Sequence, residues 1–281
     1  MPELPEVETV RKGLERYLQG RTFRQVILRR DGLRFPFPKN LAATLTGKTV
    51  QKVERRAKYL LIHMTDNVTM LGHLGMTGSF VFSAEEEYQP SRHDHLLFKL
   101  SDGSTMVYND PRRFGVIDLL QTGAEKEHRL LAHLGPEPLT SDWQAGVFCE
   151  AIRHKQGAIK TTILDQKVVV GVGNIYACEA LFMSRISPRR KASSVAGKKA
   201  TGIRAKRLVE AVKLVLQEAI EAGGSTLQDF QDVEGKAGYF AHQFQVYDRE
   251  GKECVRDECS STIRRIVQAG RSTFYCPTCQ R

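Results

Sequence analysis

The chain has 281 residues, enough for a sizeable core and about two domains, and its 41% hydrophobic and 26% charged residues are ordinary for a globular protein. No apolar run reaches the ~18 residues that a membrane span needs, and acidic residues stand where a signal peptide would be basic and then apolar. We therefore expect an intracellular protein with no membrane contact.

The net charge of +10 is concentrated in two runs. The longer one, residues 185–213, opposes one acid with ten lysines and arginines: Arg185, Arg189, Arg190, Lys191, Lys198, Lys199, Arg204, Lys206, Arg207 and Lys213. The shorter one consists of Lys52, Arg55, Arg56 and Lys58. A single run of this kind is usually a solvated face, but clustered cations also suit a polyanion such as nucleic acid.

The N-terminus, MPELPEVET, offers a reactive amine. Initiator methionine is usually removed before a small residue, which would leave Pro2 with a free secondary amine. The pKa of an α-amino group is about 7.7–8.0, against about 10.4 for lysine, so part of it is unprotonated at neutral pH. Such amines form Schiff bases, and Glu3 is the first acid within reach. On its own, a Met-Pro-Glu start more often has no catalytic meaning.

A packed helix is predicted directly after this amine. Pro5 suits a first helical turn, and Glu6 and Glu8 favour a helix N-terminus. Apolar residues then recur at helical spacing, at Val7, Val10, Leu14 and Leu18. The amine would therefore be held on a packed element rather than on a frayed tail.

The rest of residues 1–130 is predicted to be β-rich. Short apolar or alternating segments lie at 22–28, 49–54, 59–64, 68–74, 96–100 and 116–120. Asp102-Gly103 between two of them is a hairpin signal. Many short strands with turn signals predict a sandwich.

Helical periodicity begins after a stiff Leu-Gly-Pro-Glu-Pro-Leu linker at 134–139. Helices are expected at 156–165, 174–182 and 205–222, the last closed by Gly223-Gly224. Residues 225–240 are expected to form a mobile loop.

The sequence Gly171-Val172-Gly173-Asn174 opens the second of these helices. Tyr176 stands where a dinucleotide-binding fingerprint needs its third glycine, so that fingerprint fails. Small residues at a helix N-terminus still let a phosphate approach the backbone N–H groups. A glycine turn chosen only for close packing is the alternative.

The last 28 residues contain four cysteines spaced C-x4-C-x16-C-x2-C: Cys254, Cys259, Cys276 and Cys279. This spacing is typical of a four-cysteine structural zinc site, and reduced intracellular thiols favour metal over disulfides. Four thiolates leave no coordination position for a catalytic water, so we predict one structural Zn²⁺. The segment between the pairs alternates as strands do around Ala269-Gly270, a plausible turn.

These features together resemble the formamidopyrimidine-DNA glycosylases (Fpg). The N-terminus, the string VVVGVGNIYACEALF and the final R-x-T-F-Y-C-x-x-C-Q resemble that family's start, helix–two-turn–helix motif and zinc finger. One departure is the first cysteine pair, C-x4-C where most relatives have C-x2-C. The resemblance implies an α+β fold in three parts. These are an N-terminal catalytic β-sandwich domain with its helix (1–133), a helix–two-turn–helix DNA-binding domain with a lesion-sensing loop (134–240) and a C-terminal β-hairpin zinc finger (241–281).

The resemblance also implies roles for single residues. Pro2 would be the nucleophile and Glu3 the acid. Lys58, in Arg55-Arg56-Ala57-Lys58, would contact the phosphate near the lesion and assist catalysis. Asn174 and Arg271 would contact DNA phosphates. For Arg271 the alternative is an exposed surface arginine.

Two further segments, HLGMTG and DPRRFG, match the family and carry three residues that would enter the duplex. Met76 and Arg112 would fill the space left by the extruded base, with Arg112 bonding the orphaned cytosine, and Phe114 would wedge beside it. From sequence alone, Met76 and Phe114 are more often core residues. For His93-Asp94-His95 no third metal ligand is evident, which favours structural hydrogen bonding, and His93 is also a candidate DNA-binding residue.

The implied enzyme is a monomeric DNA glycosylase and AP lyase of base excision repair. It would flip oxidised purines such as 8-oxoguanine and formamidopyrimidines out of duplex DNA, excise them through a Schiff base on Pro2, and cut the strand by β,δ-elimination. One alternative is an endonuclease VIII-like enzyme for oxidised pyrimidines, whose start typically reads P-E-G-P-E, unlike Leu4 here. The other is a non-catalytic zinc-dependent DNA-binding protein, which the intact Pro2, Glu3 and Lys58 argue against.

Overall fold

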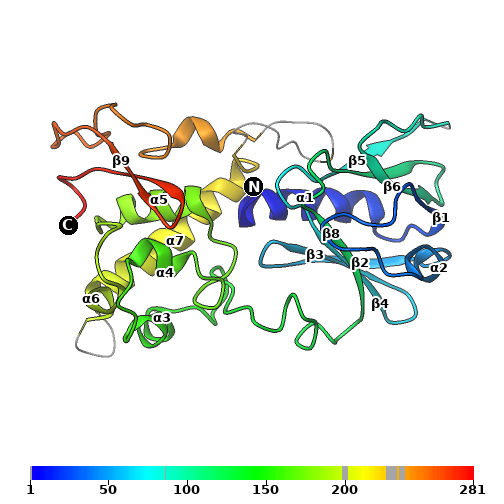
Figure 1. Ribbon diagram of the computed structural model, residues 1–281, viewed down its shortest axis with the longest axis horizontal. Coiled ribbons are helices and arrows are strands. Elements are labelled where there is room, and N and C mark those ends of the chain that lie inside the picture. The colour runs from blue at the N-terminus through cyan, green and yellow to red at the C-terminus, as the bar shows by residue number, and fades with distance from the viewer. Residues whose placement is uncertain (1, 86, 198–201, 226–232, 234–237) are drawn as a thin grey trace. The chain divides into compact units, whose positions relative to one another are not determined.

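The computed structural model describes residues 2–85, 87–197, 202–225, 233 and 238–281. The chain forms two compact units, Met1–Ala132 with Ala222–Tyr239 and His133–Glu221 with Phe240–Arg281 (Figure 1). None of the described helices combines the length and the apolarity that a bilayer-crossing segment requires.

The first unit begins with the predicted helix, α1 (Leu4–Leu18). Glu3 is its N-cap, and the backbone N–H of Glu3 donates to the Glu6 carboxylate at 2.8 Å within a capping box. The apolar positions named from the sequence, Val7, Val10, Leu14 and Leu18, are all buried. The helix prediction is therefore confirmed at its start, its end and its buried face.

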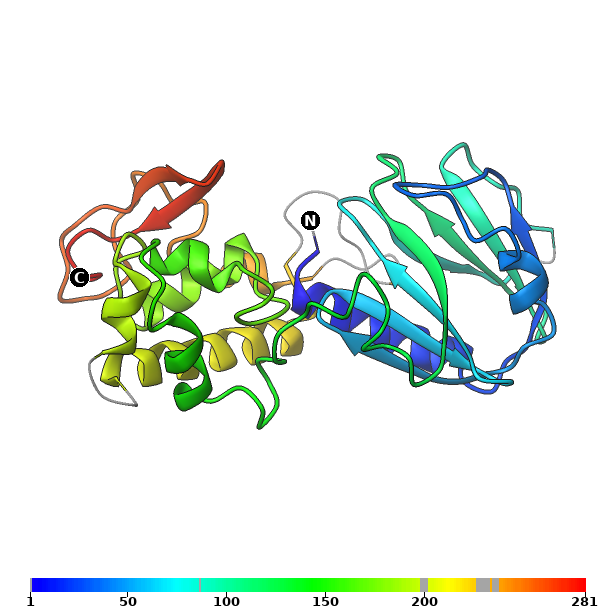
Figure 2. The ribbon, with the colours of Figure 1, turned by 60° about the horizontal axis from the view of Figure 1, so that its bottom comes forward.

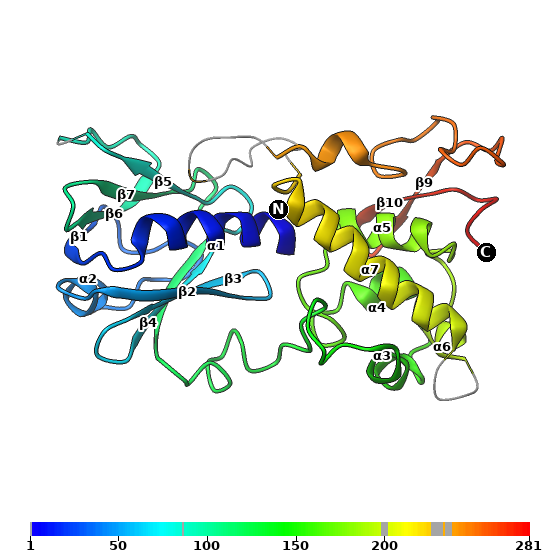
Figure 3. The ribbon, with the colours of Figure 1, turned by 180° about the vertical axis from the view of Figure 1, so that it is seen from behind.

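Two antiparallel four-stranded sheets follow, which confirms the sandwich. One sheet has the order β1 (Phe23–Leu28), β6 (Asp94–Leu100), β7 (Thr105–Asn109), β5 (Ser79–Ser83). The other has the order β2 (Val50–Arg56), β3 (Tyr59–Met64), β4 (Val68–His73), β8 (Val116–Gln121). A short helix, α2 (Leu41–Leu45), contacts β1 and β4. Figure 3 shows α1 running along the sandwich between the strands of the two sheets, where its buried face joins their common core.

Six of the eight strands that the structure describes in this sandwich match the predicted segments, and two were missed. The missed strands, β5 and β7, are only five residues long and are bounded by Ser, Thr or Asn, which weakens their β signal. The Asp102-Gly103 turn does form a hairpin, but its second strand is β7.

The second unit is helical, with a β-hairpin at the C-terminus (Figure 2). Its helices are α3 (Ala145–Ile152), α4 (Ile159–Ile163), α5 (Asn174–Met183), α6 (Ala192–Ala196) and α7 (Ile203–Glu221), with a 3-10 turn η1 (Phe240–Gln243). The predictions for α5 and α7 are confirmed, whereas α3 and α6 were not predicted. The helix expected at 156–165 shrinks to α4, because Ala158 instead pairs as a β-bridge with Lys191.

The segment after α7 returns to the first unit. Gly223 and Gly224 both have positive φ and end the helix. Ser225 then donates to the Glu6 carboxylate through its backbone N–H (2.8 Å) and its hydroxyl (2.9 Å). Residues Ala222–Tyr239 therefore group with the sandwich, whereas the sequence placed them with the helical domain. Most of the loop expected at 225–240 lies outside the described residues.

Candidate active site

The N-terminal segment is fixed at both of the positions proposed for chemistry. Pro2 is half-buried and Glu3 is 4% exposed. Glu6, 2% exposed, holds the Glu3 backbone with one carboxylate oxygen and Ser225 with the other. A residue next to Pro2 is thus anchored by a buried carboxylate, which places the amine on an ordered helix start.

Lys58 lies in the two-residue turn between β2 and β3 and is 8% exposed. The charge of Lys58 acts on His73, at the end of β4. The pKa of His73 is lowered to about 4, mainly by burial and then by the positive charges of Lys58 and Arg34. The His73 ring is therefore neutral at pH 7. Its Nδ1 accepts a hydrogen bond from Gly75 at 3.0 Å, so Nε2 carries the proton. Sequence reasoning gave His73 no role, although it begins the HLGMTG segment.

The shorter basic run is only partly available to a polyanion. Lys52 forms an ion pair with Glu54, and Arg55 forms one with Glu8 of α1. Close carboxylates offset these charges, so the interpretation of the whole run as a polyanion surface is too broad. The longer run includes Lys198 and Lys199, which lie outside the described residues.

Two loops of the first unit are tied together by Asp110, which is fully buried. Its carboxylate accepts hydrogen bonds from the Thr77 hydroxyl (2.6 Å) and the Gly115 backbone (2.8 Å). The loops also approach closely at Gly75, where a Cβ would lie 2.4 Å from the Phe114 carbonyl carbon. Asp110 and Gly75 thereby bring the Met76 and Phe114 segments together, a closure that sequence reasoning missed.

The three proposed duplex-entering residues all emerge from these loops. Met76 is 39% exposed and Phe114 44% exposed, so the interpretation of either as a core residue is wrong. Arg112 is exposed, and its guanidinium carbon lies 4.9 Å from the centre of the Phe114 ring. An exposed apolar pair beside a guanidinium is the arrangement that a base-stack wedge needs.

His93 lines a basic pocket of about 400 Å³. The other lining residues are Arg29, Arg30, Arg92, Asp94, His95, Pro111 and Arg113. The prediction that His93-Asp94-His95 form structural hydrogen bonds is confirmed for Asp94 and His95. Asp94 accepts hydrogen bonds from Tyr88, Ser91 and Asn109, and His95 Nε2 lies 2.8 Å from the Asp110 carbonyl oxygen.

In the second unit a fully buried lysine joins the start of α5 to the C-terminal hairpin. Lys160 Nζ donates to Asn174 Oδ1 (2.5 Å), Ser272 O (3.0 Å) and Thr273 Oγ1 (2.7 Å). Asn174 Nδ2 donates to the same Ser272 carbonyl at 2.9 Å. This network orients the Asn174 amide and anchors the strand that begins with Arg271. No local sequence pattern marked Lys160.

The hairpin itself forms as expected. Strands β9 (Arg264–Gln268) and β10 (Arg271–Tyr275) flank Ala269 and Gly270, which both have positive φ. Arg271 is exposed directly after this turn, at the tip of the hairpin. Asn174 and Arg271 are therefore connected through Ser272.

The four C-terminal cysteines converge, in spite of the C-x4-C spacing. Their sulfur atoms all lie within 4.8 Å of one another, with 3.9 Å between Cys254 and Cys279 and 3.7 Å between Cys259 and Cys276. A tetrahedron with Zn–S bonds of about 2.3 Å has edges of about 3.8 Å, so the arrangement fits zinc. Although burial opposes ionisation, N–H groups of Cys279 and Thr278 lower the pKa of Cys276 to about 7.

Two substitutions should distinguish the role of the metal from the role of the arginine at the hairpin tip. We expect Cys276→Ser to release zinc and loosen the hairpin, since a structural metal supplies the folding free energy of such a module. Arg271→Ala should keep stoichiometric zinc and lower the salt dependence of DNA binding by about one counterion. Metal analysis and binding titrations at several salt concentrations test both, with Arg264→Ala, an exposed arginine at the far end of the hairpin, as control. Native protein prepared without chelator and lacking zinc would contradict the metal assignment.

Three family models match the chain. Residues 1–117 match the formamidopyrimidine-DNA glycosylase N-terminal domain, and residues 134–231 match the H2TH domain of the same enzymes. Residues 251–281 match the zinc finger found in FPG and IleRS. The matches cover the sandwich, the helical region and the cysteine cluster.

Relatives are similar over the whole chain. A formamidopyrimidine-DNA glycosylase of Roseobacter denitrificans is 46% identical over 288 residues, with 100% of both chains covered. The crystal structure of MutM (Fpg) from Thermus thermophilus is 40% identical, with a TM-score of 0.86 over 99% of this chain and 98% of that one. A complex of Lactococcus lactis Fpg with DNA containing an oxidised pyrimidine is 33% identical, with a TM-score of 0.88 and 100% of both chains covered.

Proposed function

The chain belongs to the formamidopyrimidine-DNA glycosylase family, and on that premise we propose that Pro2 is the nucleophile with which it excises oxidised purines from duplex DNA. It is a DNA glycosylase of base excision repair and has one structural zinc site, formed by its four C-terminal cysteines. The observation that carries the proposal is the anchored start of α1, where Pro2 adjoins the buried Glu3.

The proposed chemistry uses the two residues at this helix start. Once Met1 is removed, the Pro2 nitrogen attacks C1′ of the flipped nucleotide and the C1′–base bond breaks. Glu3 donates a proton to the sugar ring oxygen, which lets the ring open to an iminium. The iminium acidifies the C2′ proton, and successive β- and δ-elimination then break the strand on both sides of the sugar.

The remaining candidates serve binding in this proposal. Lys58 contacts the phosphate near the lesion and assists catalysis. Met76, Arg112 and Phe114 occupy the duplex where the base has left. Asn174 and Arg271 contact phosphates, with the zinc-supported hairpin presenting Arg271, and His93 contacts the DNA.

We place three functional parts along the chain, at 1–133, 134–240 and 241–281, for catalysis, DNA binding and the zinc finger. The exposed wedge residues and the basic pocket support the first part as a DNA-facing surface. The enzyme works as a monomer in the bacterial cytoplasm.

Substrate choice separates this proposal from its nearest rival. The L. lactis complex shows that an Fpg can hold DNA with an oxidised pyrimidine, so binding alone does not discriminate. We expect single-turnover excision of 8-oxoguanine opposite cytosine to be at least about tenfold faster than excision of an oxidised pyrimidine. The cut strand should carry phosphates at both new ends, as β,δ-elimination requires.

Two results would contradict the proposed function. Faster excision of the oxidised pyrimidine would favour an endonuclease VIII-like enzyme. Tight binding of lesion DNA with no excision of either base would favour the non-catalytic DNA-binding protein. An undamaged duplex of the same sequence is the control for both measurements.

A further inference from the structure

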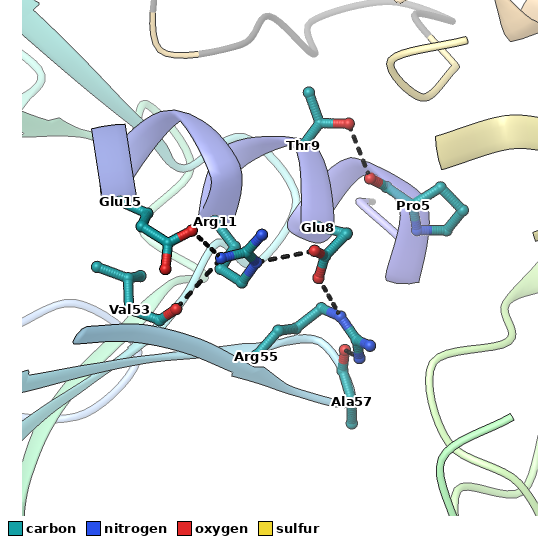
Figure 4. Close-up of polar contacts among 8 residues, drawn as sticks. All are labelled: Pro5, Glu8, Thr9, Arg11, Glu15, Val53, Arg55 and Ala57. Atoms are coloured by element: carbon teal, nitrogen blue, oxygen red, sulfur yellow. Dashed lines mark hydrogen bonds and ion pairs between the residues drawn. The ribbon is translucent and has the colours of Figure 1, made fainter. Parts of the chain in front are cut away.

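The segment Arg55-Arg56-Ala57-Lys58 contains two arginines to which the proposed function gives no role, and the first of them, Arg55, contacts both α1 and the turn that carries Lys58. Arg55, whose side chain is 11% exposed, donates from Nε to Glu8 Oε2 at 2.9 Å. Glu8 belongs to α1, the helix that begins just after Pro2 and Glu3. Arg55 therefore connects strand β2 to the element that carries the proposed nucleophile (Figure 4).

The same guanidinium also reaches the turn that carries Lys58. Arg55 Nη1 donates to the Ala57 carbonyl oxygen at 2.9 Å. That oxygen belongs to the peptide group joining Ala57 to Lys58, so the hydrogen bond fixes the plane from which Lys58 extends. Figure 4 shows Arg55 between Glu8 and Ala57, with a contact to each.

The turn needs such support because of its backbone conformation. Ala57 has φ of 54°, in the left-handed region that alanine adopts at an energetic cost. Arg56 and Tyr59 are paired across the turn, so Ala57 and Lys58 have no freedom to relax along the strands. A part-buried hydrogen bond from Arg55 to the Ala57 carbonyl stabilises the strained conformation.

We propose that Arg55 is a positioning residue for Lys58, which it holds in a fixed place relative to the start of α1. The inference rests on the proposed function, because the placement of Lys58 matters only if Lys58 assists the reaction. A planar guanidinium can serve Glu8 and the Ala57 carbonyl at once through separate N–H groups. A lysine ammonium at this position keeps the charge but lacks that fork.

Arg11 offers a matched control. It shares the Glu8 carboxylate, donating to Oε1 at 2.8 Å, and it also bonds Glu15 (2.6 Å) and the Val53 carbonyl (3.3 Å). Arg11 therefore connects α1 to β2 as Arg55 does. Its described hydrogen bond on the strand is to Val53, whereas that of Arg55 is to Ala57 in the turn that carries Lys58. Loss of Arg11 weakens the same packing without releasing the Ala57–Lys58 peptide.

The test measures single-turnover excision of 8-oxoguanine at saturating enzyme, together with DNA affinity and thermal stability. We expect Arg55→Gln to slow excision by about tenfold, because a small misplacement of a catalytic group is costly. Arg55→Lys should give an intermediate loss. Arg11→Gln should excise at the wild-type rate, even where its thermal stability falls as far as that of Arg55→Gln.

A double variant distinguishes an effect through Lys58 from a general loss of stability. If Arg55 acts through Lys58, then Arg55→Gln added to Lys58→Met should slow excision by less than about twofold beyond Lys58→Met alone. Independent, multiplying effects would overturn the inference, as would equal rates for Arg55→Gln and Arg11→Gln. A wild-type protein that binds lesion DNA and excises nothing would instead overturn the proposed function, and this inference with it.

Discussion

A chain that carries one extra residue in front of Pro2 should excise 8-oxoguanine at least about a thousandfold more slowly, because loss of a catalytic nucleophile lowers the rate by this much or more. The extension converts the Pro2 nitrogen into an amide, which has no free electron pair for attack on C1′. DNA binding should be nearly unchanged, since the phosphate candidates and the zinc site lie elsewhere in the chain. Excision and binding are measured on the same 8-oxoguanine duplex.

Removal of the extension provides the control. A site-specific protease that leaves Pro2 as the first residue should restore the wild-type excision rate in the same preparation. An extended chain that excises at the wild-type rate would show that the Pro2 amine is not the nucleophile.

Glu3→Gln should bind lesion DNA normally and excise it about 10²–10⁴-fold more slowly, the usual contribution of a positioned general acid. The substitution preserves the size of a residue that is only 4% exposed, and the Glu3 backbone N–H can still donate to Glu6. What disappears is the proton that Glu3 delivers to the sugar ring oxygen. The helix should remain capped, so thermal stability should change little.

The matched control is Glu15→Gln on the same helix, whose side chain is 36% exposed and paired with Arg11. That variant removes one carboxylate charge without touching the helix start, and it should excise at the wild-type rate. A Glu3→Gln protein as fast as the Glu15→Gln protein would remove Glu3 from the mechanism.

The sequence predicted those features that depend on residues close together in the chain. Helical spacing and a proline in the first turn were enough for α1, and alternation around Ala269-Gly270 was enough for the C-terminal hairpin. The four cysteines were identified because metal ligands cluster in sequence in small zinc modules. The short strands β5 and β7 were missed because five residues with polar ends carry little periodicity.

The contacts that organise the site were not predictable in this way. Thr77 and Asp110 are 33 residues apart, Glu8 and Arg55 are 47 apart, and Lys160 and Ser272 are 112 apart. Each pair depends on the folded topology, and no single-sequence pattern marks its partners. Met76 and Phe114 illustrate the same limit, since their apolar character favours burial and only the closed loops leave them exposed.

The most direct test of the account traps the covalent intermediate. Wild-type protein is incubated with a duplex containing 8-oxoguanine opposite cytosine in the presence of borohydride, and the protein–DNA adduct is digested and mapped by mass spectrometry. We predict a single adduct on the nitrogen of Pro2, in a chain from which Met1 has been removed. An adduct on a lysine, or efficient excision without any trapped adduct, would contradict the central claim.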